Sequence, residues 1–231
     1  IIKLPASANI KTHQCKSNII PNLLLKRLKD HSQRLGKLTQ RLMEGLVIKD
    51  QQTYMRSIKM SDEAQELFYC LEELIVLCPK RYGSWGVDEI HKVFLGKNVE
   101  QGFSSWPQGT PVMCNENLPD LDLSNGDIGV VIGEGDQRRL LFRIVLEGGE
   151  LVSRFIHPAR LKILQPALAM TIHKAQGSEA NEVIVLLPGQ YTKSFHAIER
   201  TNKDKSYEER LVYTAITRAK NNVQLIIEHC E

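Results

Sequence analysis

Two short apolar runs constrain the fold of this chain more than any other feature. Leu74–Cys78 reads LIVLC and ends at Pro79, and Glu182–Leu187 reads EVIVLL. Runs of this length are typical of strands that are buried on both faces of a parallel sheet. Helical patterns follow the two runs, at 87–95 and at 207–219, and a final strand is expected at Val223–Ile227. Strands that alternate with helices predict an α/β domain.

Between these runs the pattern changes over residues 106–165. Gly, Asn and Asp separate short apolar segments, with turn signals at Asn125-Gly126 and Gly148-Gly149. Four strands are expected there: Thr110–Cys114, Ile128–Ile132, Arg139–Val145 and Leu151–Ile156. Closely spaced short strands predict a small antiparallel β-barrel inserted into the α/β domain.

The first sixty residues are strongly basic, with 12 Lys and Arg against 3 Asp and Glu, although the whole chain has a net charge of only +3. Residues 1–18 show no period and are expected to be irregular. A helix is expected from about Pro21, because leucines then recur at spacings of three, four and seven: Leu24, Leu28, Leu35, Leu38, Leu42 and Leu46. This arm suits contact with nucleic acid or an acidic partner, and a solvated helix surface explains its charge equally well.

Composition argues against several classes of protein. No apolar run approaches the roughly 18 residues that a membrane span needs, so no membrane partner is expected. The N-terminus resembles no signal peptide and lacks an initiator Met, so we expect a piece of a longer protein. No C-x-x-C pair occurs among the five cysteines, which predicts reduced thiols in a cytoplasmic protein rather than a metal site: Cys15, Cys70, Cys78, Cys114 and Cys230.

A polar loop, TIHKAQGSE at 171–179, follows a strand expected at Ala167–Thr171. Ligands of parallel sheets bind beyond the carboxyl ends of strands. Three side chains of the loop can hold phosphates: Thr171, His173 and Lys174. Gly177 permits close approach of the backbone to a phosphate, and Glu179 can accept a hydrogen bond from a ribose hydroxyl. An ordinary polar loop is the alternative.

A second motif, RLVYTAITRAK at 210–220, lies on the expected C-terminal helix. A spacing of four places a stripe of small and apolar residues on its buried face: Leu211, Ala215 and Ala219. The polar face carries Arg210, Thr214, Thr217 and Arg218. A guanidinium forks onto phosphate oxygens, which suits the charge that develops at a γ-phosphate. Taken alone, Arg218 is better explained by a surface salt bridge.

Together, the two motifs resemble motifs V and VI of superfamily-one DNA helicases, in the same order. NGDIG at 125–129 resembles the signature of the barrel that RecD-like members carry before motif V. The segment IVLCPKRYGSWGVDEIHKVF is similar to the RecD region in which a loop joins a strand to a helix. The resemblance covers roughly residues 65–230. Ala180 departs from the RecD-like pattern, which has an aromatic residue there, and this puts the packing of the motif in doubt.

This resemblance implies the second RecA-like domain of a helicase, a parallel sheet with flanking helices at 65–105 and 166–231. The barrel at 106–165 would interrupt it, and 1–64 would be a basic helical arm that leads to a first RecA-like domain. Arg218 would be the catalytic arginine finger, presented at the carboxyl edge of the sheet near the TIHKAQGSE loop. The nucleotide would meet Gln176, Gly177, Glu179 and Tyr213. Coupling to DNA would involve Thr171, His173, Lys174, Ser178 and Thr217.

ATP and Mg²⁺ would be held mainly by the first RecA-like domain, because no G-x-x-x-x-G-K-[ST] loop occurs in this chain. Asp88-Glu89-Ile90-His91 imitates a metal-binding box, but RYGSWG precedes it where a hydrophobic strand should, so no metal site is expected. By itself the chain is therefore not expected to hydrolyse ATP.

The implied function is that of a RecD-type helicase subunit, the alpha chain of exodeoxyribonuclease V, in double-strand break repair and recombination. It would move 5′→3′ on single-stranded DNA with RecB- and RecC-type partners. Three alternatives stay open: another superfamily-one motor of the conjugative relaxase or Pif type, a non-enzymatic scaffold subunit, and a free-standing DNA-binding module.

Overall fold

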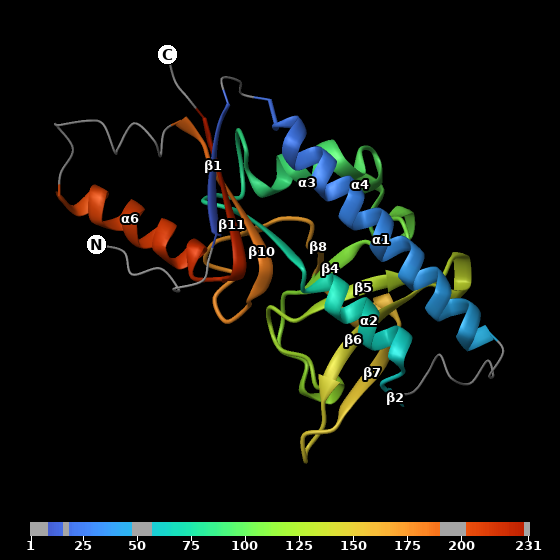
Figure 1. Cartoon of the computed structure of the whole chain (residues 1–231). Coiled ribbons are helices and arrows are strands. Elements are labelled where there is room, and N and C mark those ends of the chain that lie inside the picture. Colours follow the sequence, from blue (N-terminus) through green and yellow to red (C-terminus); the bar gives the residue numbers. More distant parts are fainter. Residues whose placement is uncertain (1–8, 16–18, 48–56, 190–201, 229–231) are drawn as a thin grey trace. The chain divides into compact units, whose positions relative to one another are not determined.

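The computed structural model describes residues 9–15, 19–47, 57–189 and 202–228 of the chain (Figure 1). The contacts within it divide the chain into two compact units. The first unit is made of three segments: Ile1–Arg27, Glu72–Phe94 and Ala169–Glu231. The second is made of Leu28–Leu71 and Leu95–Leu168. The boundaries that we predicted from the sequence at 64, 105 and 165 remain predictions.

The first unit is built on a five-stranded sheet in which every described pair is parallel. Its strand order is β1-β11-β10-β3-β9, with β1, β11 and β10 visible side by side in Figure 1. The strands are β1 (Asn9–Cys15), β3 (Leu74–Cys78), β9 (Met170–Thr171), β10 (Ala180–Leu187) and β11 (Ala219–Glu228). The predicted apolar strands are confirmed, because every residue of β3 and the last five of β10 are buried.

Three of the described helices contribute to this unit. They are α3 (Val87–Leu95), α6 (Asn202–Ile216) and the beginning of α1 (Asn22–Val47). Arg27 of α1 forms an ion pair with Glu182 of β10, at 2.8 Å between Nη2 and Oε2. The same guanidinium lies 3.8 Å from Glu73, just before β3. Arg27 thus ties the first turns of α1 to the amino ends of two neighbouring strands.

The expectation that residues 1–18 are irregular is wrong for 9–15, which form strand β1. This strand pairs in register with β11, from Asn9 opposite Asn222 to Cys15 opposite Glu228. Its residues are either exposed or half-buried, and none is fully buried. An edge strand of this kind is held by backbone hydrogen bonds and needs few apolar side chains, so its sequence carries no hydrophobic pattern.

Two further boundaries differ from those expected. The C-terminal helix ends at Ile216 and β11 begins at Ala219, although the sequence pattern had extended the helix to 219 and delayed the strand to 223. The cause is a hydrogen bond from Ala180 N to Arg218 O at 3.0 Å, which joins this backbone to β10. Of the strand expected at Ala167–Thr171, only Met170 and Thr171 form a strand, β9. The residues before them connect the sheet of the second unit to that of the first.

The second unit contains a six-stranded antiparallel sheet in the order β2-β7-β6-β5-β4-β8. Its strands are β2 (Ser57–Lys59), β4 (Pro111–Cys114), β5 (Ile128–Ile132), β6 (Arg139–Val145), β7 (Leu151–Ile156) and β8 (Leu164–Pro166). The predicted antiparallel module is confirmed. Short helices and turns lie beside it: α4 (Asn98–Gln101), Phe103–Ser105, Pro119–Leu121, Gly135–Gln137 and Pro158–Arg160.

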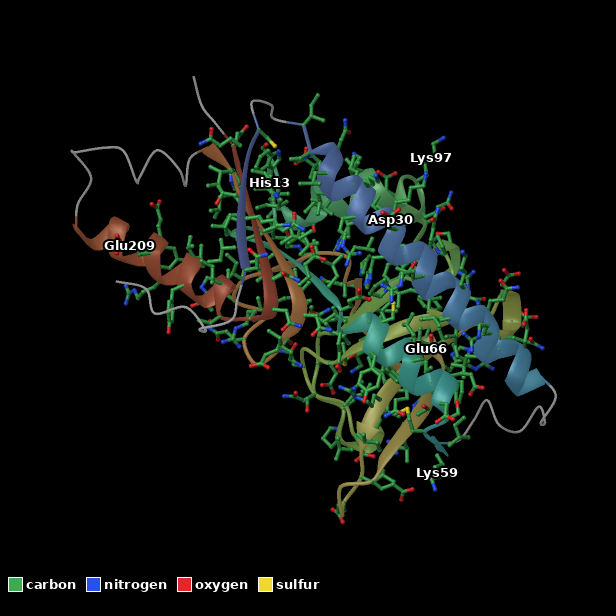
Figure 2. All side chains as sticks on the ribbon, in the orientation of Figure 1. His13, Asp30, Lys59, Glu66, Lys97 and Glu209 are labelled. Carbon is green, nitrogen blue, oxygen red and sulfur yellow. The ribbon has the colours of Figure 1, made fainter. Side chains whose placement is uncertain are left out.

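Two helices share the core of this module, the later part of α1 and α2 (Asp62–Leu71). The predicted leucine stripe contributes Leu35 and Leu42, which pack in one cluster with Phe68 of α2 and with strand residues. Ser61 caps the amino end of α2, since its Oγ accepts a hydrogen bond from Ala64 N at 3.2 Å. Glu66 of α2, labelled in Figure 2, forms an exposed ion pair with Arg41 of α1 at 3.4 Å.

Three of the cysteines, Cys70, Cys78 and Cys114, are buried free thiols, and Cys15 is a half-buried one. Burial raises the pKa of the Cys78 and Cys114 thiols, so they stay protonated and unreactive. Cys230 lies outside the described residues. Among the helices in the described ranges, none has the length and apolar character to cross a bilayer.

Candidate functional site

The TIHKAQGSE loop connects opposite edges of the parallel sheet. It leaves β9 at Thr171, where the next amide, Ile172 N, donates a hydrogen bond to Cys78 O at the carboxyl end of β3 (3.0 Å). It ends at Ala180, the first residue of β10. At that end Glu182 N donates to Glu73 O, just before β3, at 2.9 Å. The loop therefore runs back along the whole of β3, about 17 Å at the usual rise of a strand.

A chain of tight turns gives the loop its course. The amides of Lys174 and Ala175 donate to Thr171 O at 2.9 and 3.2 Å, and Ser178 N donates to Ala175 O at 3.1 Å. Ala175 is fully buried, as is Ile172, and the two anchor the loop. Gly177 has a φ of +90°, which favours glycine, with open space where a Cβ would be. The exposed side chains are His173, Lys174, Gln176 and Glu179.

Arg218 lies at the amino end of β11, in the turn that follows α6. Its Nε donates to Thr214 O and its Nη2 to Thr217 Oγ1, both at 3.3 Å, and its own carbonyl accepts from Ala180 N. The expectation of a carboxyl-edge position for this arginine is wrong. A residue that directly precedes a strand of a parallel sheet must lie at the amino edge. Arg218 is nevertheless joined to the end of the loop through Ala180.

The structure also shows how Ala180, which departs from the RecD-like pattern, packs. Its side chain is fully buried at the start of β10. The small residue is thus accommodated where the RecD-like pattern has an aromatic one.

The beginning of the loop faces other elements. The His173 ring stacks on that of Tyr207 of α6, with centroids 6.4 Å apart and planes inclined by 24°. Burial, with a smaller contribution from the Arg81 guanidinium, lowers the pKa of Lys174. Arg81 belongs to the loop between β3 and α3. Sequence reasoning missed Tyr207 and Arg81. The Arg81-Tyr82 pair shortly after the buried strand Leu74–Cys78 was a signal that could have pointed to Arg81.

The structure therefore separates the predicted site residues into two groups. Thr171, His173 and Lys174 lie toward the carboxyl end of β9, and Glu179 lies beside Ala180 and Arg218 at the amino edge. Between these groups lie Gln176, Gly177 and Ser178. On α6 and the turn after it, Tyr213 O accepts a hydrogen bond from Thr217 N at 3.0 Å, and the Tyr213 side chain is 44% exposed.

The Asp88-Glu89-Ile90-His91 segment, which imitates a metal-binding box, makes contacts within the protein. Asp88 pairs with Arg81, at 3.2 Å between Oδ1 and Nε. Glu89 accepts a hydrogen bond from Trp85 N at 2.6 Å, and His91 Nε2 accepts one from Ala169 N at 3.3 Å. Burial lowers the pKa of His91 to about 4. Each of the three side chains holds the β3–α3 loop or the approach to β9.

Both motifs lie within a segment, 166–226, that matches the family of UvrD-like helicase C-terminal domains. This segment of the chain is thus similar to a helicase C-terminal domain.

Within that class, the chain is similar to RecD subunits of RecBCD enzymes. It is 32% identical to RecD of Mycolicibacterium smegmatis, over 74% of this chain and 28% of the relative. RecD of Mycobacterium tuberculosis is 30% identical, over 68% of this chain and 25% of the relative. The chain spans about a quarter of the length of these relatives. A crystal structure of Bacteroides Pif1 bound to single-stranded DNA overlaps 66% of this chain and 40% of its own, with 18% identity and a TM-score of 0.36, too weak a likeness to add to the argument.

Proposed function

We propose that this chain supplies the second nucleotide-facing half of a RecD-type, ATP-driven DNA helicase. In this proposal ATP lies between two RecA-like domains. The triphosphate and Mg²⁺ are held by the first domain, and Arg218 approaches the γ-phosphate from the second. Hydrolysis then depends on closure of the two domains.

One observation carries the proposal: a single short loop links the two edges of the sheet. At one end it presents His173 and Lys174, which suit a DNA backbone. At the other it is joined to Arg218 by the 3.0 Å hydrogen bond from Ala180 N to Arg218 O. If DNA displaces the loop, the displacement is transmitted to Arg218 through the backbone of the loop and through this hydrogen bond. Such a route is what coupling of DNA binding to ATP hydrolysis requires.

The residues at the amino edge, and Gly177 in the loop that leads to it, fit a nucleotide's phosphates. The Arg218 side chain is half-buried and carries five N–H donors, two of which make the bonds to Thr214 and Thr217. Those two bonds hold the guanidinium at the end of α6 without neutralising its charge. At Gly177, open space lies where a Cβ would be, so a ligand can approach the backbone. Glu179 is exposed and able to accept a hydrogen bond from a ribose.

The finer parts of the proposal rest on the similarity to RecD subunits. They are 5′→3′ translocation on single-stranded DNA, RecB- and RecC-type partners, and a cytoplasmic location. They also include the division into a second RecA-like domain at 65–105 and 166–231, an inserted barrel at 106–165 and an arm at 1–64. Gln176, Gly177, Glu179 and Tyr213 contact the nucleotide in this scheme. Thr171, His173, Lys174, Ser178 and Thr217 couple it to DNA.

The decisive test removes the arginine finger in a protein that contains both proposed RecA-like domains. Arg218→Ala should lower kcat for ATP hydrolysis by a factor of about 10³ or more, because the charge that develops at the γ-phosphate loses its partner. The Kd for a fluorescent ATP analogue should change little. Arg218→Lys keeps the charge without the fork, so its turnover should stay well below that of the unaltered protein.

Arg210→Ala is the matched control, since Arg210 is an exposed arginine of α6, about two helical turns before Arg218 in the chain. Its turnover should stay normal. Normal turnover in Arg218→Ala would remove the finger assignment.

A further inference from the structure

The loop between β3 and α3, residues 79–86, begins at the same edge of the sheet as the TIHKAQGSE loop. Leu77 pairs with Met170 and Cys78 with Thr171, so the two loops leave adjacent strands at the same level. The helicase motifs assign no role to the loop at 79–86. It carries two cations, Lys80 and Arg81, and two aromatic residues, Tyr82 and Trp85.

This loop is rigidly built. Trp85 has a φ of +56°, which is strained for a large side chain, and it is fully buried. Its backbone N donates to Glu89 Oε2 at 2.6 Å, and its Nε1 donates to Ile19 O at 3.2 Å. A Cβ on Gly86 would lie 2.7 Å from the Arg81 carbonyl oxygen. Strain of this kind persists only where the surroundings over-determine it, and it is concentrated at binding sites.

The rigid loop presents a ring and a cation to solvent. Tyr82 is 69% exposed, and the Arg81 Cζ lies 5.5 Å from the centre of its ring. Arg81 also contacts Asp88, in an ion pair whose two side chains are each 42% exposed. Lys174 lies close enough for the Arg81 charge to lower its pKa. Arg81 and Tyr82 lie on one loop and Lys174 on the loop that leaves the adjacent strand, so positive charge that attracts an anion and an exposed ring that can stack are found at the same edge of the sheet.

We propose that Tyr82, Arg81 and Lys174 form a binding site for one nucleotide of single-stranded DNA. The base stacks on the Tyr82 ring, and Arg81 and Lys174 contact the adjoining phosphate. The partner is single-stranded because the faces of bases inside a duplex are covered by neighbouring base pairs, whereas a single strand leaves them accessible to the ring, and the rigidity of the loop lowers the entropy lost on binding. This inference rests on the proposed function, in which DNA meets the same edge, and adds a base contact to it.

The test measures binding of the 231-residue chain to a fluorescently labelled oligothymidylate by anisotropy, over a salt titration that begins at about 50 mM. Tyr82→Ala should raise Kd about fivefold or more, and Tyr82→Phe should bind like the unaltered chain, because stacking needs only the ring. The slope of log K against log salt should be unchanged in both. Tyr82→Ala should not weaken binding to a duplex. Tyr69→Ala is the matched control, because Tyr69 is a 61% exposed tyrosine on α2 in the other unit.

Arg81→Ala should behave differently. It should lower the salt slope by about 0.7, the value for one phosphate contact on a single strand. Arg41→Ala, which breaks the exposed ion pair with Glu66, should leave the slope unchanged.

Three results would be decisive against the site. If the unaltered chain binds but Tyr82→Ala binds equally well, with an unchanged circular dichroism spectrum, the nucleotide site is overturned while the proposed DNA edge stands. If Tyr82→Phe loses as much affinity as Tyr82→Ala, stacking is not the cause. If the unaltered chain binds no oligothymidylate at low salt, both proposals fall.

Discussion

His91 makes the first unit sensitive to acid. It is 5% exposed on α3, and its Nε2 accepts the hydrogen bond from Ala169 N, the residue before β9. Burial is the main cause that lowers its pKa from 6.5 to about 4, and the Arg81 charge acts in the same direction. The Asp88 charge opposes the shift only in part. A proton on Nε2 would also turn the acceptor into a donor and break its bond to the strand that leads into the loop.

The direction of the pH effect follows from the two pKa values. At pH 7 the imidazole is neutral in both the folded and the unfolded chain. As the pH falls below 6.5, the unfolded chain binds a proton that the folded chain excludes until about pH 4, so stability is lost over that window. The full difference is about 3 kcal/mol, of which about 2 kcal/mol is lost between pH 7 and pH 5.

Fluorescence can isolate this unit. The chain has two tryptophans, Trp85 in the first unit and Trp106 in the second, so Trp106→Phe leaves Trp85 as the reporter. Urea unfolding is followed at pH 7 and pH 5 in this background, with and without the substitution His91→Gln. The introduced glutamine can accept the bond from Ala169 but does not titrate. The chain that keeps His91 should therefore lose about 2 kcal/mol more on acidification than the His91→Gln variant.

The matched control is His157→Gln. His157 Nδ1 likewise accepts a backbone hydrogen bond, from Ala159 N at 3.2 Å, but the histidine is exposed and in the other unit. Its replacement should leave the pH dependence of the Trp85 transition unchanged. Equal losses between pH 7 and pH 5 with His91 and with His91→Gln would refute the reasoning.

Substitution of two glycines by alanine should lower stability for different reasons. Gly86→Ala places a Cβ 2.7 Å from the Arg81 carbonyl oxygen and 2.9 Å from that of Gly83, backbone atoms that have no room to turn aside, so urea unfolding should show a loss of about 3 kcal/mol. Gly177→Ala meets open space, and the cost of its φ of +90° should be about 1 kcal/mol in the same measurement. It should also weaken the DNA-stimulated ATPase of the proposed two-domain protein. A larger loss at Gly177 than at Gly86 would contradict the distinction between clash and strain.

Much of the fold was predictable because its elements carry local patterns. The runs at Leu74–Cys78 and Glu182–Leu187 are buried strands, and the leucine spacing from Leu24 to Leu42 lies on α1. The failure at β1 has the opposite cause. That edge strand is stabilised by backbone pairing with β11, which lies far along the chain, so its own side chains need not show a period.

The candidate site divides in the same way. The side chains that suit phosphates, on the TIHKAQGSE loop and at Arg218, were identifiable because their chemistry belongs to the residue types themselves. Their placement was not. The carboxyl-edge position expected for Arg218 was wrong, although the strand predicted after it already implied the amino edge.

The sequence by itself determined the alternation of strands and helices, the antiparallel module and the phosphate-binding groups, since each depends on neighbours along the chain. Only the tertiary structure decided that one loop spans both edges of the sheet, that Tyr207 stacks on His173, and that the loops of Arg81 and Lys174 leave adjacent strands at the same level. These contacts join segments that are distant in sequence, and the order of strands in the sheet brings them together.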